Sequence, residues 1–171
     1  KPMVNSVTCR QEDMDAIFPL VKKYGGVVIG LTMDEEGIPK TSEGRVRIAE
    51  KILRRAEEYG IGREDVVMDA LTLAISAGAD ARVTLEAARR IKEELGVRTI
   101  LGISNVSFGL PGREQLNAAF LSLAVACGLD AAIVTPLSEP VMRALCAAHA
   151  LVGADPDCAS YIAKTAGKGA R

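Results

Sequence analysis

Short apolar segments alternate along the chain with longer amphipathic segments, and a glycine follows each long segment. The apolar segments span residues 3–8, 27–33, 66–73, 98–104 and 130–135. The amphipathic segments span residues 11–24, 43–59, 82–95, 113–127 and 139–152, and the glycines that follow are Gly25, Gly60, Gly96, Gly128 and Gly153. Glycine just after a helix adopts the left-handed cap conformation at little cost. The pattern therefore predicts five strand-helix units in succession.

The predicted strands are continuous apolar runs, as in VVIGLTM, TILGISN and AAIVTP, and do not alternate between apolar and polar residues. Such runs are typical of a parallel sheet that is covered by helices, so the predicted fold class is α/β. In the fourth helix, an apolar stripe at helical spacing is expected to pack on the sheet. This stripe consists of Leu116, Phe120, Leu123 and Cys127.

Five strands are fewer than the eight of a closed (β/α)8 barrel, which typically has about 250 residues. The 171 residues are therefore either one domain that is part of a larger barrel or a complete small open sheet. The chain starts almost directly on an apolar segment, which suits an internal cut, and we expect no secretory leader.

Composition and charge argue against nucleic acid, membrane spans, disulfides and metal sites. The chain has 21 basic and 22 acidic residues, a formal charge of -1 and both signs interspersed, which argues against nucleic acid as a partner. Its longest apolar stretches are far shorter than the roughly 20 residues of a membrane span. Four cysteines without a CxxC pair, in apolar surroundings and with a single histidine, predict buried free thiols in a reducing cytoplasm. We expect no metal site.

Polar residues at the strand ends are the candidates for chemistry, because sites on parallel sheets form where the strands end. Asp69 interrupts the apolar run VVMDALTLAI, so its charge needs a partner or water. A carboxylate presents two adjacent acceptors, which match the two N–H donors on the edge of a pterin. The alternative is an aspartate that caps a loop or pairs with an arginine.

Asn105 and Arg113 lie at and after the end of the fourth strand, in GISNVSFGLPGR. An amide both donates and accepts, so Asn105 can adapt as a ring nitrogen exchanges a methyl group for a proton; an ordinary Asx turn is the alternative. Arg113 begins a helix, a poor position for a cation, and is either kept for a ligand or paired with a carboxylate. The acidic tract at 34–36 has the spacing of a solvated loop.

The segment GISNVSFGLPGREQLNAAFL resembles the pattern GxSNxSFGLPxRxxxNxxFL of the folate-binding domain of cobalamin-dependent methionine synthases. The strand VVMDALTLAISA, and further PMVNSVT and VVIGLTMDEEGIPKT, resemble other strands of that domain in the same order. The resemblance covers about residues 2–151. The related methyltetrahydrofolate:corrinoid iron-sulfur protein methyltransferases share the SNVS core but are less similar around Asp69.

The resemblance implies the fold and the activity. It implies the C-terminal part, about five βα units, of a TIM barrel of the dihydropteroate synthase type, with the first three units absent from residues 1–171. It also implies a methyltransferase that binds 5-methyltetrahydrofolate and transfers the methyl group to a cobalt(I) corrinoid, on the way to homocysteine and methionine. Dihydropteroate synthesis itself is disfavoured, because AAIVTPL lacks that family's Arg-x-His motif.

Carried over to this chain, the resemblance assigns the site residues. Asp69 becomes the pterin-edge carboxylate and Asn105 the amide near the methyl-bearing nitrogen, and both are the catalytic candidates. The folate-binding residues would be Asn5, Asp69, Gly102, Ser104, Asn105 and Arg113. The corrinoid signature DxHxxG is missing, since the single His149 lies in AAHAL, so another domain or protein would supply the cobalamin.

Three alternatives stay open at this point. The acceptor system is either homocysteine-linked cobalamin or an iron-sulfur corrinoid protein. The chain is either a catalytic unit or a non-catalytic barrel fragment that folds or binds only with a partner, and its exposed sheet edges predict association into homo-oligomers. A sugar-phosphate barrel enzyme is disfavoured because residues 132–139, near the expected phosphate loop, contain no glycine.

Overall fold

A single parallel sheet organises the molecule, in a computed structural model that describes residues 1–166. The sheet has the strand order β1-β2-β3-β4-β5, and every neighbouring pair is parallel. The strands are β1 (Met3–Val7), β2 (Val27–Leu31), β3 (Val66–Asp69), β4 (Arg98–Gly102) and β5 (Ala131–Ile133). The predicted parallel sheet in chain order is thus confirmed.

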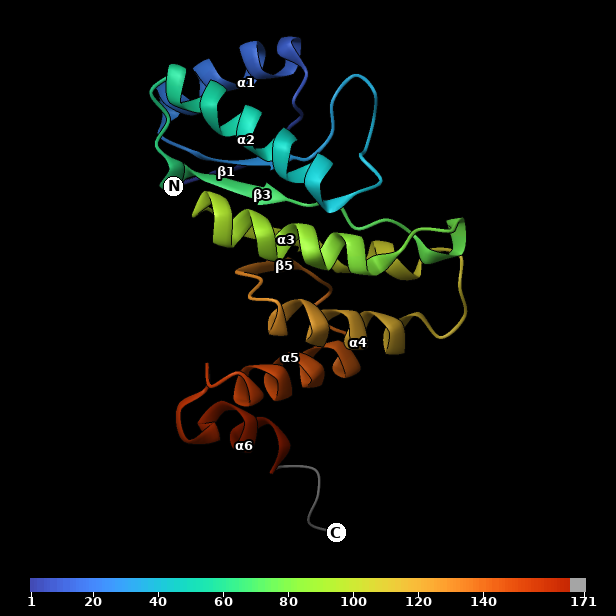
Figure 1. Cartoon of the computed structure of the whole chain (residues 1–171). Helices are drawn as coiled ribbons and strands as arrows, with labels where there is room; N and C mark the ends of the chain where they lie inside the picture. Colours follow the sequence, from blue (N-terminus) through green and yellow to red (C-terminus); the bar gives the residue numbers. More distant parts are fainter. Residues whose placement is uncertain (167–171) are drawn as a thin grey trace.

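Each strand is followed by a helix, and the helices begin and end close to the predicted residues. They are α1 (Gln11–Tyr24), α2 (Ser42–Glu58), α3 (Ala81–Leu95), α4 (Arg113–Ala126) and α5 (Glu139–Leu151). The side chain of Thr41 caps α2 by accepting a hydrogen bond from Gly44 N at 3.1 Å, and α1 ends at Gly25 with a φ of 67°. A short helix that the periodicity did not predict, α6 (Ala159–Thr165), follows α5 (Figure 1).

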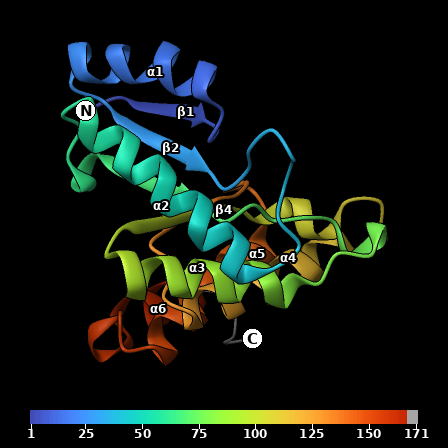
Figure 2. The same cartoon turned by 45° about the horizontal axis from the view of Figure 1, so that its top comes forward.

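The sheet curls, and the helices lie on its convex side, as in half of a barrel (Figures 1 and 2). The main core fills the space between sheet and helices, and its fully buried side chains include Phe18, Ile52, Met68 and Leu101. A second, small cluster covers the concave side and consists of strand residues alone, namely Ile29, Val67 and Ile100. The prediction of an α/β fold with part of a barrel is therefore confirmed.

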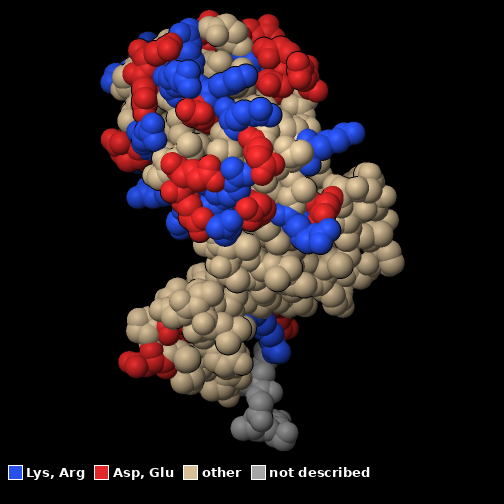
Figure 3. Space-filling view, in the orientation of Figure 1, with Lys and Arg blue, Asp and Glu red and all other residues tan. Residues whose placement is uncertain are grey.

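Charged side chains are unevenly spread over this architecture. On the face shown in Figure 3 they are dense over α1, α2 and α3, whereas the part of this face around α4, α5 and α6 is mostly uncharged. Among the described residues, no helix is both long enough and apolar enough to cross a membrane.

The structure corrects three details. Asp69 is the last residue of β3, not an interior one, because the backbone leaves the sheet there. The predicted stripe on α4 is wrong at Leu123, which is 56% exposed, while Leu121 and Ala124 are buried with Phe120. Packing against α5 rotates the buried face of α4, and the apolar sequence allowed either face. All four cysteines are free, but only Cys9 and Cys146 are buried, whereas Cys127 is partly buried and Cys158 is exposed.

Candidate functional site

The concave side of the sheet brings three of the predicted residues onto one face. Register pairs Asn5 with Ile29, Asp69 with Ile100 and Gly102 with Ile133. Side chains alternate between the two faces of a strand, and paired residues share a face. Since Ile29 and Ile100 belong to the concave cluster, Asn5, Asp69 and Gly102 all face the concave side.

Asp69 ends β3 at the carboxyl edge of the sheet, half-buried beside Leu31 and Ile100. Its Oδ1 accepts a hydrogen bond from Leu71 N at 2.7 Å, and no described residue donates to its Oδ2. Burial raises the pKa of Asp69 to about 6, against the lowering effects of the Leu71 N–H and the charge of Arg45. The carboxylate therefore ionises near neutral pH and keeps one oxygen free to accept from a ligand.

Asn105 lies directly after β4, in the short 3-10 turn η3 (Ile103–Ser107), and its side chain is exposed. Its amide has no hydrogen-bond partner among the described residues. A methyl group added to Gly102 would lie 3.2 Å from Asn105 Nδ2, so the absence of a side chain at Gly102 lets the amide approach the concave end of β4. β3 and β4 are neighbours, so the structure places Asp69 and Asn105 at adjoining strand ends on the same edge.

Arg113, the first residue of α4, hydrogen-bonds to the turn that carries Asn105. Its Nε donates to Ser107 Oγ at 3.0 Å, and its Nη2 donates to the carbonyl of Ser104 at 2.9 Å. The guanidinium also lies 5.9 Å from the ring centre of Phe108. The sequence suggested either a ligand contact or a carboxylate partner for this cation, whereas its described bonds stabilise η3.

Arg45 is a residue near the site that the sequence analysis missed. It is 2% exposed, and its Nη1 donates to the carbonyls of Ala70 and Leu71, the residues that follow Asp69. The sequence contained a signal for the burial of Arg45, because this residue lies on the same face of α2 as the apolar residues Ile48 and Ile52. A cation on the apolar stripe of a helix requires buried partners.

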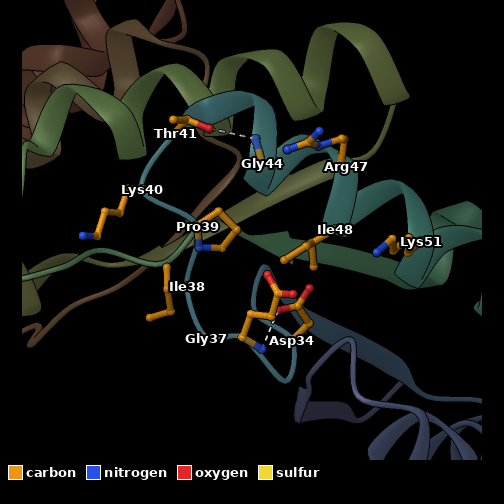
Figure 4. Close-up of a pocket in the computed structure, with 11 residues that line it drawn as sticks. Asp34, Gly37, Ile38, Pro39, Lys40, Thr41, Gly44, Arg47, Ile48 and Lys51 are labelled. Carbon is orange, nitrogen blue, oxygen red and sulfur yellow. Dashed lines mark hydrogen bonds between the residues drawn. The ribbon is translucent and has the colours of Figure 1, made fainter.

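A cleft of about 540 Å³ lies between the loop after β2 and helix α2 (Figure 4). Asp34, Lys40, Arg47 and Lys51 are among its lining residues, and none of the predicted folate contacts is. The acidic tract of residues 34–36 borders this cleft. No group of three or more His, Cys, Asp or Glu side chains within residues 1–166 could hold a metal ion.

The parallel sheet and the polar residues at its strand ends agree with the class of protein that comparison with known families identifies. Residues 1–135 match the family described as pterin binding enzyme. The chain therefore belongs to the pterin-binding enzyme family.

Two kinds of relative resemble this chain. The chain is 30% identical over 165 residues to a methylcorrinoid:tetrahydrofolate methyltransferase of Eubacterium limosum, and the match covers 93% of this chain and 60% of the relative. It is 39% identical over 124 residues to a methionine synthase of Mycobacterium tuberculosis and 37% identical to that of Mycobacterium leprae. The matches to the synthases cover 67% of this chain but 10% of each synthase, so the chain spans only part of each of these three relatives.

Proposed function

We propose that the concave edge of the sheet binds the pterin ring of 5-methyltetrahydrofolate and supports transfer of its methyl group to a cobalt(I) corrinoid. One observation carries the proposal. In a member of the pterin-binding family, a carboxylate with a free oxygen and an unpaired amide stand at adjoining strand ends, at Asp69 and Asn105. The final acceptor in this proposal is homocysteine, as in methionine synthesis.

Each residue has a separate role in this proposal. The ionised Asp69 accepts from the adjacent N–H groups on the pterin edge, and these bonds fix the orientation of the ring. The amide of Asn105 lies near the methyl-bearing nitrogen. In this proposal Gly102 and Ser104 line one wall of the pterin site and Asn5 lines a neighbouring wall, while Arg113, which hydrogen-bonds to the turn that carries Asn105, contacts the folate.

The reaction needs help at the ring nitrogen, because an uncharged tertiary amine is a poor leaving group. A proton from solvent adds to the nitrogen, which gives it positive charge, and the electron pair of the bond to the methyl carbon then stays on the nitrogen as that bond breaks. A cobalt(I) corrinoid bound by the partner would supply the electron pair for the new bond to the methyl carbon. Asn105 stabilises the positive character that develops on the nitrogen, and the amide is not itself the acid.

The corrinoid comes from another domain or protein in this proposal. The chain lacks the DxHxxG signature, and the nearest candidate, His149, lies in α5. The name of one relative, a methylcorrinoid:tetrahydrofolate methyltransferase, describes transfer of a methyl group from a corrinoid to tetrahydrofolate, which is the reverse of the direction proposed here. Since the same groups serve both directions, the site fits either, and methyl transfer with a corrinoid iron-sulfur protein is the second candidate.

We further propose that residues 1–171 form one partial barrel unit that acts in the cytoplasm, with the first three βα units outside this chain. A non-catalytic unit that folds or binds only with a partner is the competing possibility. Folate binding by the chain itself separates the two.

Calorimetric titration of the chain with methyltetrahydrofolate tests the proposed function. Asp69→Asn puts an amide where the pterin donors need an acceptor, a mismatch that costs on the order of 1–3 kcal/mol, so we expect affinity to fall about tenfold or more. Asp65→Asn is the matched control, because Asp65 precedes β3 at the opposite end and pairs with Lys1. Folded wild-type protein that binds no folate, or equal affinity in both variants, would overturn the assignment.

A further inference from the structure

Arg45 is a buried cation whose direct hydrogen bonds all go to neutral groups. Its Nε donates to the carbonyl of Pro39 at 3.0 Å, and its Nη1 donates to Thr84 Oγ1 at 2.9 Å. The same Nη1 reaches the carbonyls of Ala70 at 2.7 Å and Leu71 at 2.9 Å. Burial of a charged guanidinium costs desolvation energy, so packing alone does not explain why an arginine is found here.

The two carbonyls belong to the turn that follows Asp69, and this turn is conformationally strained. Leu71 has a φ of 62°, in the left-handed region, which is unfavourable for a residue with a side chain. Thr84 from α3 adds a second restraint, since its hydroxyl donates to the carbonyl of Leu71 at 3.1 Å. Helices α2 and α3 together hold the turn in a conformation that the leucine would not adopt by itself.

The strained turn has a direct consequence for Asp69. It points the N–H of Leu71 back at the carboxyl group, where it donates to Oδ1 at 2.7 Å. That bond occupies one oxygen and fixes the plane of the carboxylate, so the orientation of Oδ2 depends on the turn. Arg45 thus acts on the carboxylate through the backbone, without a salt bridge to it among the described contacts.

We propose that Arg45 is a positioning residue for Asp69, which holds the turn at 70–71 so that the carboxylate presents its free oxygen to the pterin edge. The inference rests on the proposed function only for the identity of the ligand, the pterin, that Asp69 binds. The link from Arg45 through Leu71 to Asp69 stands on the described geometry.

The charge of Arg45 supports the same role. Of the titratable groups around Asp69, Arg45 on α2 lowers the pKa of the carboxyl, as does the Leu71 N–H, while burial raises it. Asp69 acts reciprocally on Arg45, whose pKa is lowered by burial and raised by the carboxylate. Loss of Arg45 should therefore disturb both the orientation and the ionisation of Asp69.

The test uses the whole chain with Arg45→Met, Arg45→Lys and Thr84→Val, and with Arg47→Met as the control on the exposed face of α2. The first readout is the carboxyl carbon resonance of Asp69, titrated by NMR and assigned with Asp69→Asn. The second is methyltetrahydrofolate affinity by calorimetry. We expect Arg45→Met to raise the pKa of Asp69 and to weaken folate binding about tenfold, whereas Arg47→Met changes neither.

Arg45→Lys separates charge from geometry. A lysine keeps the charge, so the pKa of Asp69 should stay near its wild-type value, but one ammonium cannot reproduce the planar donor set. Affinity should fall about threefold to fivefold in Arg45→Lys, and by a similar factor in Thr84→Val, which removes both restraints from Thr84.

The outcomes keep the two proposals apart. If the wild-type chain binds no folate but Arg45→Met still shifts the titration of Asp69, the proposed function fails and the positioning role stands. A folded Arg45→Met with wild-type titration and wild-type affinity would overturn the positioning role. Should Arg45→Met fail to fold, wild-type affinity in both Arg45→Lys and Thr84→Val would overturn it equally.

Discussion

At the scale of single residues, the raised pKa of Asp69 couples its protonation to ligand binding. The carboxyl titrates at about 6, and a proton on the free Oδ2 would place a donor against the pterin donors, so only the ionised form presents an acceptor there. Folate binding should therefore be flat above about pH 7 and weaken as the pH falls through 6. Calorimetry between pH 5.5 and 8 measures this, and Asp69→Asn serves as the control, in which the dependence disappears.

The same pKa predicts an opposite effect on stability. A carboxyl whose pKa is raised by folding stabilises the fold most below its unfolded value of 3.8, and this contribution is lost as the pH rises through 6. At pH 7.5 the native state thus carries an unfavourable charge, and Asp69→Asn should unfold a few degrees higher than the wild type. A lower melting temperature for this variant at pH 7.5 would show that the burial of the charge is not costly.

Asn105 should affect the rate more than the binding. Its amide contact strengthens as the ring nitrogen gains positive character, so Asn105→Ala should slow methyl transfer to cobalt(I) corrinoid more than it lowers folate affinity. The transfer rate is measured by stopped flow at saturating methyltetrahydrofolate, in the intact enzyme, which includes the remaining βα units of the barrel and the corrinoid partner. A wild-type rate under these conditions would remove Asn105 from the proposed mechanism.

At the scale of elements, the close approach of α2 to the sheet depends on the small residue Gly30. A methyl group there would lie 2.9 Å from Met68 Sδ and 3.0 Å from Ile52 Cγ2, all within the main core. Gly30→Ala should therefore destabilise the protein by about 1–3 kcal/mol through overpacking. Urea unfolding measures this, and the cost should shrink in a Met68→Ala background, where the added methyl group has room. Equal costs in both backgrounds would exclude a clash with Met68.

At the scale of the whole molecule, the curled sheet leaves apolar surface on its concave side and at its edges. Met3 on β1 is 52% exposed and Ile133 on β5 is 47% exposed, and these strands are the two edges of the described sheet. The isolated 171-residue chain should therefore self-associate in a concentration-dependent way, as seen by sedimentation velocity. Ile133→Lys should shift the chain toward monomer, whereas the control Leu151→Lys on α5 should not. A monomer at all concentrations would contradict this prediction.

The sequence by itself determined the order of the elements and most of the candidate site. The spacing of apolar residues and the glycines after the helices are local signals, so the α/β class, the five strands and the bounds of α1 followed from them. The placement of Asp69 and Asn105 on neighbouring parallel strands also followed, but the sequence put Asp69 inside a strand of residues 66–73, whereas it is the last residue of β3. Their folate-binding roles came from the resemblance to a known family and stay predictions.

The tertiary structure alone decided the features that depend on contacts between distant segments. The position of Arg45 on the apolar stripe of α2 was a local signal for burial, but only the packed chain supplies its acceptors, the carbonyls of Ala70 and Leu71, which lie 25 and 26 residues away in the sequence. Leu123 is exposed while Leu121 and Ala124 are buried, a choice that the mostly apolar sequence of residues 118–126 left open. Burial and hydrogen-bond partners are properties of the packed chain, and a one-dimensional pattern does not contain them.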